Sequence, residues 1–318
     1  MRMIITYVAT ACLLVSSADA QAPPANAALR YWMAFAVMRD PPADKATADL
    51  LEQVSEGRAA WDEEKLGRIV DDNREALDIM RRASVLTVCD WGLEYELGPR
   101  TPISHLAKAR ALGRLSVVAG KRLQAQGQLS QAVDMWLAGV RFSQHIAQGG
   151  SLISALSGGR VMAPSLRAIH REPVLRSLDA DTKKRIEAVL RAMPETGFDL
   201  AAAMRRDTAS LDVTLSELQA AADQKAYLAR IGAPADMTAP SPAEIAAFHA
   251  FMERIEEALA LPLIIQRGSK LAEVEAGRQA LHPFFRRFSP SSMPLGTSAL
   301  WIEIAGRRQS LLDAVTRP

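Results

Sequence analysis

The apolar residues of this chain recur at helical spacing along almost its whole length. Leu66, Ile69, Val70, Leu77 and Met80 follow one another at steps of three, four and seven residues, which places them on one face of a helix. No convincing strand, with apolar and polar residues alternating for more than a few positions, is found. The sequence therefore predicts an all-α protein, built of antiparallel helical hairpins in a repeat-like or irregular array.

Several helices have clear start signals. In "SPAE", Ser241 can cap a helix, Pro242 occupies the first helical position and Glu244 completes a capping box. Asp179 is expected to open another helix by the same capping chemistry. A long helix is expected to follow it from about residue 200 to residue 230.

The segment 232–242, "GAPADMTAPSP", interrupts this pattern, because its prolines and glycine prevent a helix from continuing. It serves either as a linker between domains or as a long connection inside one bundle. We expect a helical domain over 21–231 and a C-terminal helical segment over 243–318 that packs on the first.

Residues 1–20 have the pattern of a secretory signal peptide. Arg2 precedes a short apolar run, and Ala18 and Ala20 form a small-x-small cleavage signal. The run is shorter than the roughly 20 apolar residues that span a bilayer. We expect an exported protein, periplasmic or extracellular, with no transmembrane segment in the mature chain. The alternative is a lipid anchor on Cys12.

Charge and cysteine content narrow the range of functions. The formal net charge is +2, and the basic residues are scattered, which argues against a nucleic-acid binder. Removal of residues 1–20 leaves Cys89 as the single cysteine, so the mature chain cannot form an internal disulfide. We expect Cys89 to be a buried free thiol.

Residues 113–146 read as two helices with a turn near Gly127. Gly120, Leu123, Ala132 and Trp136 occupy spacings at which the tetratricopeptide repeat places its small and large residues. The segment therefore resembles a single tetratricopeptide repeat, a family in which small residues let paired helices approach closely. This resemblance implies a helical hairpin and degenerate neighbouring repeats or capping helices.

The match departs from the repeat pattern at three positions. Ser116 replaces an aromatic residue, Ala119 replaces a leucine, and Gln144 stands where a proline is usual. One repeat length to either side, the pattern does not recur. The chain as a whole also resembles exported helical proteins of bacteria, which implies a fold but no functional residues.

The stretch 87–105, "TVCDWGLEYELGPRTPISH", is the richest in reactive side chains and is the best candidate site. As an active site it would use carboxylates, a base and stacking rings, an arrangement that suits sugar chemistry. The weak catalytic candidates are Asp90, Glu94, Glu96 and His105, and the weak ligand-binding candidates are Trp91 and Tyr95.

A structural role explains the same stretch more simply. Trp91, Leu93, Tyr95 and Leu97 alternate with glycine and glutamate, as in a loop whose one side is attached to a helical core. We favour the anchored loop over the active site.

No catalytic, dinucleotide-binding or phosphate-loop motif is found, and we expect no cofactor. His249, Glu253 and Glu256 share one strip of a helix, but further ligands are not identifiable, so we expect a solvated face and no metal site.

Three functions remain, and the first is favoured. We expect an exported binding or scaffolding protein with a protein or peptide partner in the cell envelope, since helical hairpins form grooves for such partners. The alternatives are an envelope hydrolase that uses loop 89–105, and a carrier of an apolar ligand in a cavity near Phe248 and Met252.

Overall fold

The computed structural model describes residues 25–40, 44–261, 264–288 and 295–317. Residues 1–20 and Cys12 lie outside the described residues. The N-terminal part of the chain contains α1 (Ala27–Val37), α2 (Lys45–Glu56), α3 (Glu63–Asp72), α4 (Arg74–Ala83), the 3-10 helix η1 (Tyr95–Arg100), α5 (His105–Ala125), α6 (Leu129–Ala147) and α7 (Leu152–Ile169).

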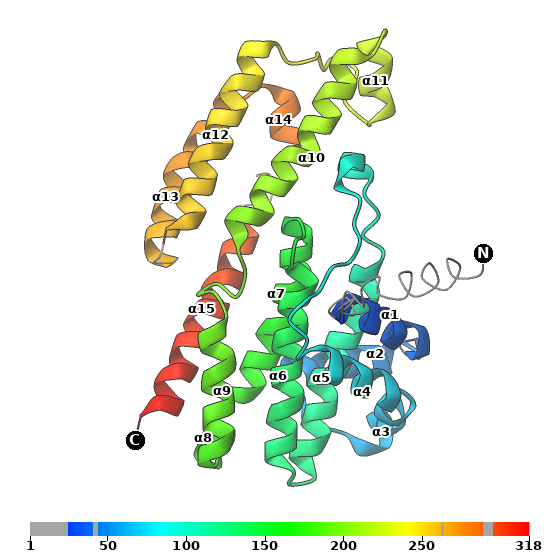
Figure 1. Ribbon diagram of the computed structural model, residues 1–318, viewed down its shortest axis with the longest axis vertical. Helices are drawn as coiled ribbons and strands as arrows, with labels where there is room; N and C mark the ends of the chain where they lie inside the picture. Colours follow the sequence, from blue (N-terminus) through cyan, green and yellow to red (C-terminus); the bar gives the residue numbers. More distant parts are fainter. Residues whose placement is uncertain (1–24, 41–43, 262–263, 289–294, 318) are drawn as a thin grey trace, which may run out of the picture.

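The remaining elements complete the chain (Figure 1). They are α8 (Glu172–Arg176), α9 (Ala180–Ala192), α10 (Leu200–Ala220), α11 (Gln224–Arg230), α12 (Pro242–Ala260), α13 (Ile264–Ala276), the 3-10 helix η2 (Gly277–Ala280), α14 (Pro283–Phe288) and α15 (Leu295–Thr316).

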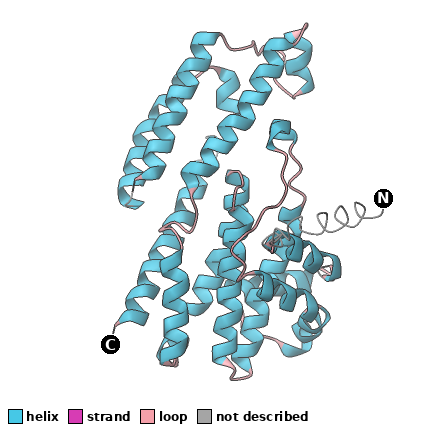
Figure 2. Cartoon of the chain, in the orientation of Figure 1, coloured by secondary structure: helices cyan, strands magenta, loops and turns pink. Residues whose placement is uncertain are grey.

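The all-α fold expected from the sequence is confirmed (Figure 2). Within the described ranges there is no strand, and the only β-type pairing is an isolated parallel bridge between Asn26 and Val88. In the same ranges, no helix has both the length and the apolar character needed to cross a bilayer.

The helix-start signals at Ser241 and Asp179 are confirmed. Ser241 and Glu244 form a complete capping box at the start of α12, with Pro242 in its first turn. Asp179 caps α9 by accepting the backbone N–H of Thr182 at 2.6 Å. Short polar side chains thus satisfy backbone N–H groups that would otherwise lack a partner.

The long helix expected over 200–230 is wrong, because it is two helices. α10 ends at Ala220, where Ala221 turns to an extended conformation. Asp223 then caps α11 by accepting the backbone N–H of Ala226 at 2.9 Å. The second cap was overlooked because the apolar spacing continues across the break.

The helical hairpin expected near residues 113–146 is present as α5 and α6. Gly127 turns the chain between them with a φ of 76°. The Gly120 backbone lies against the indole of Trp136, and a Cβ atom at position 120 would come within 2.1 Å of Trp136 Nε1. Close approach of the helices therefore depends on Gly120. A relationship to the tetratricopeptide repeat stays a prediction.

α7 packs against α6 as closely as α5 does. A Cβ atom on Gly139 would lie 2.7 Å from Ser165 Oγ of α7 and 3.0 Å from Ser116 Oγ of α5. Both serine hydroxyls donate to carbonyl groups of their own helices, so these buried polar groups are satisfied. The three helices form a tight central layer in which α5 and α7 also meet directly, since a Cβ atom on Gly113 of α5 would lie 2.5 Å from Val161 of α7.

Two hydrophobic clusters include side chains of this layer. One extends from Ala27 to Val161, and the other from Ala132 to Val315, so α6 and α7 belong to both. The connection is not helical over 232–241, yet Phe248 and Phe284 beyond it are in the same cluster as Trp136. The C-terminal helices thus share a core with the middle of the chain.

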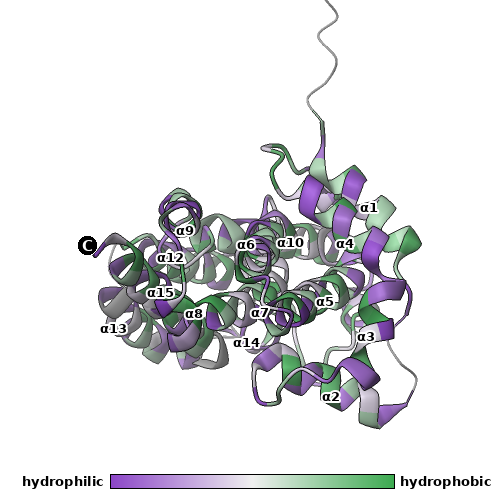
Figure 3. Ribbon diagram, turned by 90° about the horizontal axis from the view of Figure 1, so that it is seen from below, coloured by the Kyte–Doolittle hydropathy of each residue, from purple (hydrophilic) through white to green (hydrophobic). Residues whose placement is uncertain are grey.

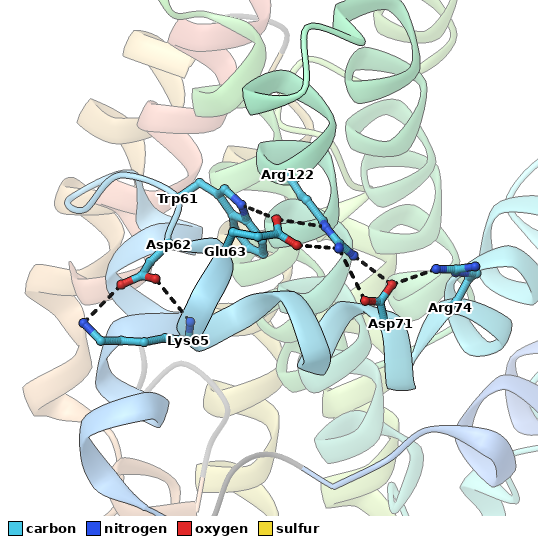
Figure 4. A network of polar contacts seen from close by, with 7 residues as sticks. All are labelled: Trp61, Asp62, Glu63, Lys65, Asp71, Arg74 and Arg122. Atoms are coloured by element: carbon cyan, nitrogen blue, oxygen red, sulfur yellow. Dashed lines mark hydrogen bonds and ion pairs between the residues drawn. The ribbon is translucent and has the colours of Figure 1, made fainter.

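Polar contacts attach α3 to α5 at the edge of the first cluster (Figure 4). Arg122 of α5 forms ion pairs with Glu63 at 2.5 Å and with Asp71 at 2.9 Å, one at each end of α3. Trp61 donates its indole N–H to Glu63 at 2.9 Å, and Arg74 also pairs with Asp71. This network fixes the direction of α3 against α5.

We predict that Gly120→Ala destabilises the protein by about 2 kcal/mol, because the added methyl group overlaps the Trp136 ring. Gly306→Ala is the matched control, since Gly306 is also helical and a Cβ atom there meets nothing within 4 Å. That control should gain up to about 1 kcal/mol of helix propensity. Urea unfolding measures both, and equal effects of the two substitutions would contradict the packing argument.

Candidate functional site

The loop between α4 and α5 is attached to α1 and α6 by its first residues. The side-chain amide of Asn26 binds the backbone of Asp90 twice. It donates its N–H to the Asp90 carbonyl oxygen at 2.7 Å, and its oxygen accepts the Asp90 N–H at 2.9 Å. Trp91 donates its indole N–H to the carbonyl oxygen of His145 at 2.7 Å. The interpretation of this stretch as an anchored loop is therefore supported for residues 88–91.

Trp91 is the centre of a buried aromatic cluster. Its indole stacks on His105 at 4.3 Å between ring centroids, and on Tyr31 and Phe35 at 5.8 and 6.2 Å. Trp32 of α1 meets it edge-on at 6.2 Å. Stacked and edge-on rings at these separations stabilise each other beyond the area they bury. The loop therefore holds α1 in place.

Burial moves the pKa of each titratable group in this cluster in the direction that favours the neutral form of the group. It lowers the pKa of His105 and of His145 to about 4. It raises the pKa of Tyr31 and, together with the charge of Asp90, raises that of Cys89 to about 12. Cys89 is buried and free, as expected, and at neutral pH it is a thiol and not a nucleophilic thiolate.

The three candidate carboxylates do not contact His105. Asp90, Glu94 and Glu96 are exposed, whereas His105 is 1% exposed beneath Trp91. Asp90 accepts the backbone N–H of Gly92 at 2.9 Å, which closes a local turn. The structure thus brings His105 and Trp91 together but leaves the carboxylates facing solvent.

Tyr95, the second candidate ring, lies at α10 and away from Trp91. The Arg206 guanidinium stacks over its ring at 4.4 Å, and Gly98 packs on Ser210 and Val213. Arg206 also lines a cavity of 380 Å³ between the end of α6 and the start of α10. The two candidate rings therefore serve different parts of the fold.

Asp207 is a half-buried acid that the sequence did not single out. It accepts the backbone N–H of Leu152 at 2.9 Å and so caps the first turn of α7 from a distant helix. Burial raises its pKa to about 6, against the opposing effect of the Leu152 N–H. The hydrogen bond to the Leu152 N–H gives this carboxylate a structural role.

The most unusual surface of the molecule is the outer face of α1. Leu29, Trp32, Met33 and Val37 are 64, 40, 50 and 38% exposed, at spacings that share one side of the helix. The opposite side, with Tyr31 and Phe35, is buried. Figure 3 shows α1 beside α4 at the periphery of the molecule. Because this helix is apolar on both faces, one of them has no partner among the described residues.

A groove of 410 Å³ adjoins this face, between α1 and α4. Met33, Ile79, Ala83 and Leu86 supply its apolar lining. Its charged residues are Arg30, Glu75 and Arg82, none of which forms an ion pair with another described residue. We name the exposed face of α1 together with this groove the α1–α4 surface.

The sequence contains one signal for the α1–α4 surface. In "AALRYWMAFAV" apolar residues occupy both sides of a helix that has a single charged residue, Arg30. Such a pattern is typical of a fully buried helix, and only the structure shows that one side is open.

The strip of His249, Glu253 and Glu256 packs toward α10. His249 lies 2.8 Å from Asp212, and Glu256 pairs with Arg205 at 3.7 Å. In the described ranges no three His, Cys, Asp or Glu side chains are arranged to hold a metal ion. Near the expected carrier cavity, the Phe248 ring stacks on Phe285 at 4.2 Å, so an aromatic side chain fills that space.

A scan against protein-family models finds no matching family, and searches of curated proteins and of solved structures find no match. Any function of this chain has to be argued from its own residues.

We predict that His105→Phe reduces the loss of stability in acid. The folded-state pKa of His105 is about 4, below the unfolded value of about 6.5. Above pH 6.5 the imidazole is neutral in both states, and the protein has its full stability. As pH falls toward 4, the unfolded state binds a proton that the folded state does not, so the folded protein loses stability. The loss is on the order of 3 kcal/mol. Phenylalanine keeps the stacking on Trp91 without a titratable group.

Urea unfolding of both proteins between pH 7 and pH 4.5 tests this prediction. Asp207 acts with the opposite sign, because its raised pKa favours the folded state as pH falls below about 6. It is present in both proteins and cancels in the difference between them. Parallel stability curves over this range would contradict a buried neutral His105.

Proposed function

We propose that this protein is a binding protein whose α1–α4 surface receives an amphipathic helix of a protein partner. The observation that carries the proposal is the exposed apolar face of α1, with Trp32 and Met33 at its centre. Tryptophan and methionine are enriched in the buried centres of protein interfaces, and they are otherwise rare in exposed clusters.

The surroundings of this face favour a helical occupant. The groove between α1 and α4 runs between two helices, and its apolar lining suits the apolar face of a third helix. Its rim has two unpaired arginines, Arg30 and Arg82, against one acid, Glu75. We therefore expect acidic residues on the flanks of the partner helix, where they would pair with the arginines.

The surface is also held rigidly enough to act as a binding site. Trp32 contacts Trp91 and His105 edge-on, so the exposed residues stand on the buried aromatic cluster. Asn26 and Val88 fix the start of α1 to the loop. Binding by a preformed surface loses less conformational entropy than binding by a flexible one.

We also propose that the chain is exported and that its partner lies in the cell envelope, a location supported by the signal-peptide pattern of residues 1–20. The hydrolase alternative lacks a supporting contact, since no carboxylate of the loop meets His105. The binding function is therefore the one that the geometry supports best.

The proposal predicts partner capture through α1. A photo-crosslinking residue at position 33 should trap a partner in envelope extract, and the same residue at position 302 should not. Ile302 is 54% exposed on α15 and so matches Met33 in exposure. The peptide attached to position 33 should be an amphipathic helix with acidic flanks.

Substitutions give the second readout. Trp32→Ser should weaken binding of the trapped partner at least about tenfold, because the apolar area buried by the ring is lost. Ile302→Ser should leave the affinity unchanged. Equal binding by both variants, or a second copy of this chain as the only species trapped at position 33, would overturn the proposal.

A further inference from the structure

A cavity of 500 Å³ lies at the crossing of α2, α5 and α7, away from the α1–α4 surface. Small residues create the space, among them Ala107, Ala111 and Ala163. Gly113 and Val161 on its wall pack so closely that a Cβ atom on Gly113 would lie 2.5 Å from Val161. A cavity of this size is within the usual range for small-molecule sites.

Four arginines line this cavity. Arg167 is already engaged, because it pairs with Glu303 at 3.1 Å and lies 3.5 Å from the carbonyl oxygen of Glu56. Arg110, Arg114 and Arg160 make no hydrogen bond or ion pair with any other described residue. Most arginines elsewhere in the described ranges have an acidic or carbonyl partner, as Arg122 and Arg185 do.

Arg110, Arg114 and Arg160 are exposed, and the protein places few acidic groups near them. Arg110 and Arg114 are one turn apart on α5, a spacing at which like charges destabilise a helix. Of the two acids that line the cavity, Glu56 pairs with Arg58 at 2.5 Å, and the Glu52 carboxylate forms no hydrogen bond or ion pair with another described residue. The cavity therefore has a surplus of positive charge.

The cavity wall also offers a hydrogen-bond acceptor. Pro164 lies inside α7 and lines the cavity, and it has no backbone N–H. The carbonyl oxygen of Arg160, four residues earlier, therefore lacks the donor that a regular helix would supply. A hydroxyl or amino group of a ligand could donate to it.

We propose that this cavity binds a small organic anion, which it holds by a carboxylate or phosphate group between Arg110, Arg114 and Arg160. Guanidinium groups bind both anions through paired hydrogen bonds, and such charge-assisted bonds are stronger than neutral ones. Glu52 and the Arg160 carbonyl oxygen receive the hydroxyl or amino groups of the same ligand.

Isothermal titration calorimetry tests the proposal with two probes, inorganic phosphate and citrate, at constant ionic strength set by sodium chloride. Saturable binding of either probe supports the site, and the tighter probe identifies phosphate or carboxylate as the preferred group. Absence of saturable binding for both probes overturns it.

Three variants locate the binding. Arg114→Gln and Arg160→Gln should each weaken it about tenfold, the usual effect of removing one charge-assisted hydrogen bond. Glu52→Gln should strengthen it, because this change removes the opposing charge from the cavity. Arg68→Gln is the control, since Arg68 is exposed on α3 and pairs with Asp72 outside the cavity.

The control at Arg68 separates a site from general attraction of anions, because Arg68→Gln and Arg114→Gln each remove one positive charge but only Arg114 lines the cavity. If Arg68→Gln weakens binding as much as Arg114→Gln does, the proposal is wrong. Because all four side chains are exposed or paired at the surface, none of these substitutions should disturb the fold.

Discussion

The close approach of α5 and α7 to α6 is the constraint on which the rest of the structure depends. Gly120 admits the Trp136 indole, and Gly139 admits the hydroxyls of Ser116 and Ser165. Because α6 contributes side chains to both hydrophobic clusters, a wider separation of these helices would disturb the packing of both clusters. The glycines and serines of this layer are therefore as important for the fold as its large apolar residues.

This layer also organises the surface on which we place partner binding. The last turn of α6 supplies the His145 carbonyl that holds Trp91, and the His145 ring that accepts or donates a hydrogen bond at Tyr31. Trp91 in turn supports Trp32 on α1. An exposed apolar helix would be unstable alone, and here α1 is attached to α6 through a series of ring contacts and hydrogen bonds.

The sequence was sufficient for the fold class and for local helix starts, because these depend on apolar spacing and on capping residues such as Ser241 and Asp179. It also indicated the anchored loop, since Trp91 is buried and the glutamates beside it are exposed. Leu97 departs from the alternation, because it is 37% exposed. The break between α10 and α11 could not be read from spacing that continues across it.

Sites formed by residues that are distant in the sequence could not be predicted from the sequence alone. Arg110 and Arg160 come together only because α5 and α7 cross, and nothing near either residue in the sequence indicates the other. The exposed side of α1 could not be predicted either, because the apolar composition of this helix is typical of a helix that is buried on all sides. Which face stays open depends on the position of α4 and of the loop.

The cap that Asp207 provides to α7 has a consequence for the order of events during synthesis. The acceptor for the Leu152 N–H is 55 residues further along the chain, so it reaches the start of α7 only after α10 has been made and has docked. Until then the first turn of α7 lacks this acceptor, and helix ends without one fray. The central layer is therefore completed by the C-terminal half of the chain, and a nascent chain that ends at α9 would expose the joint between the two halves to proteases and chaperones.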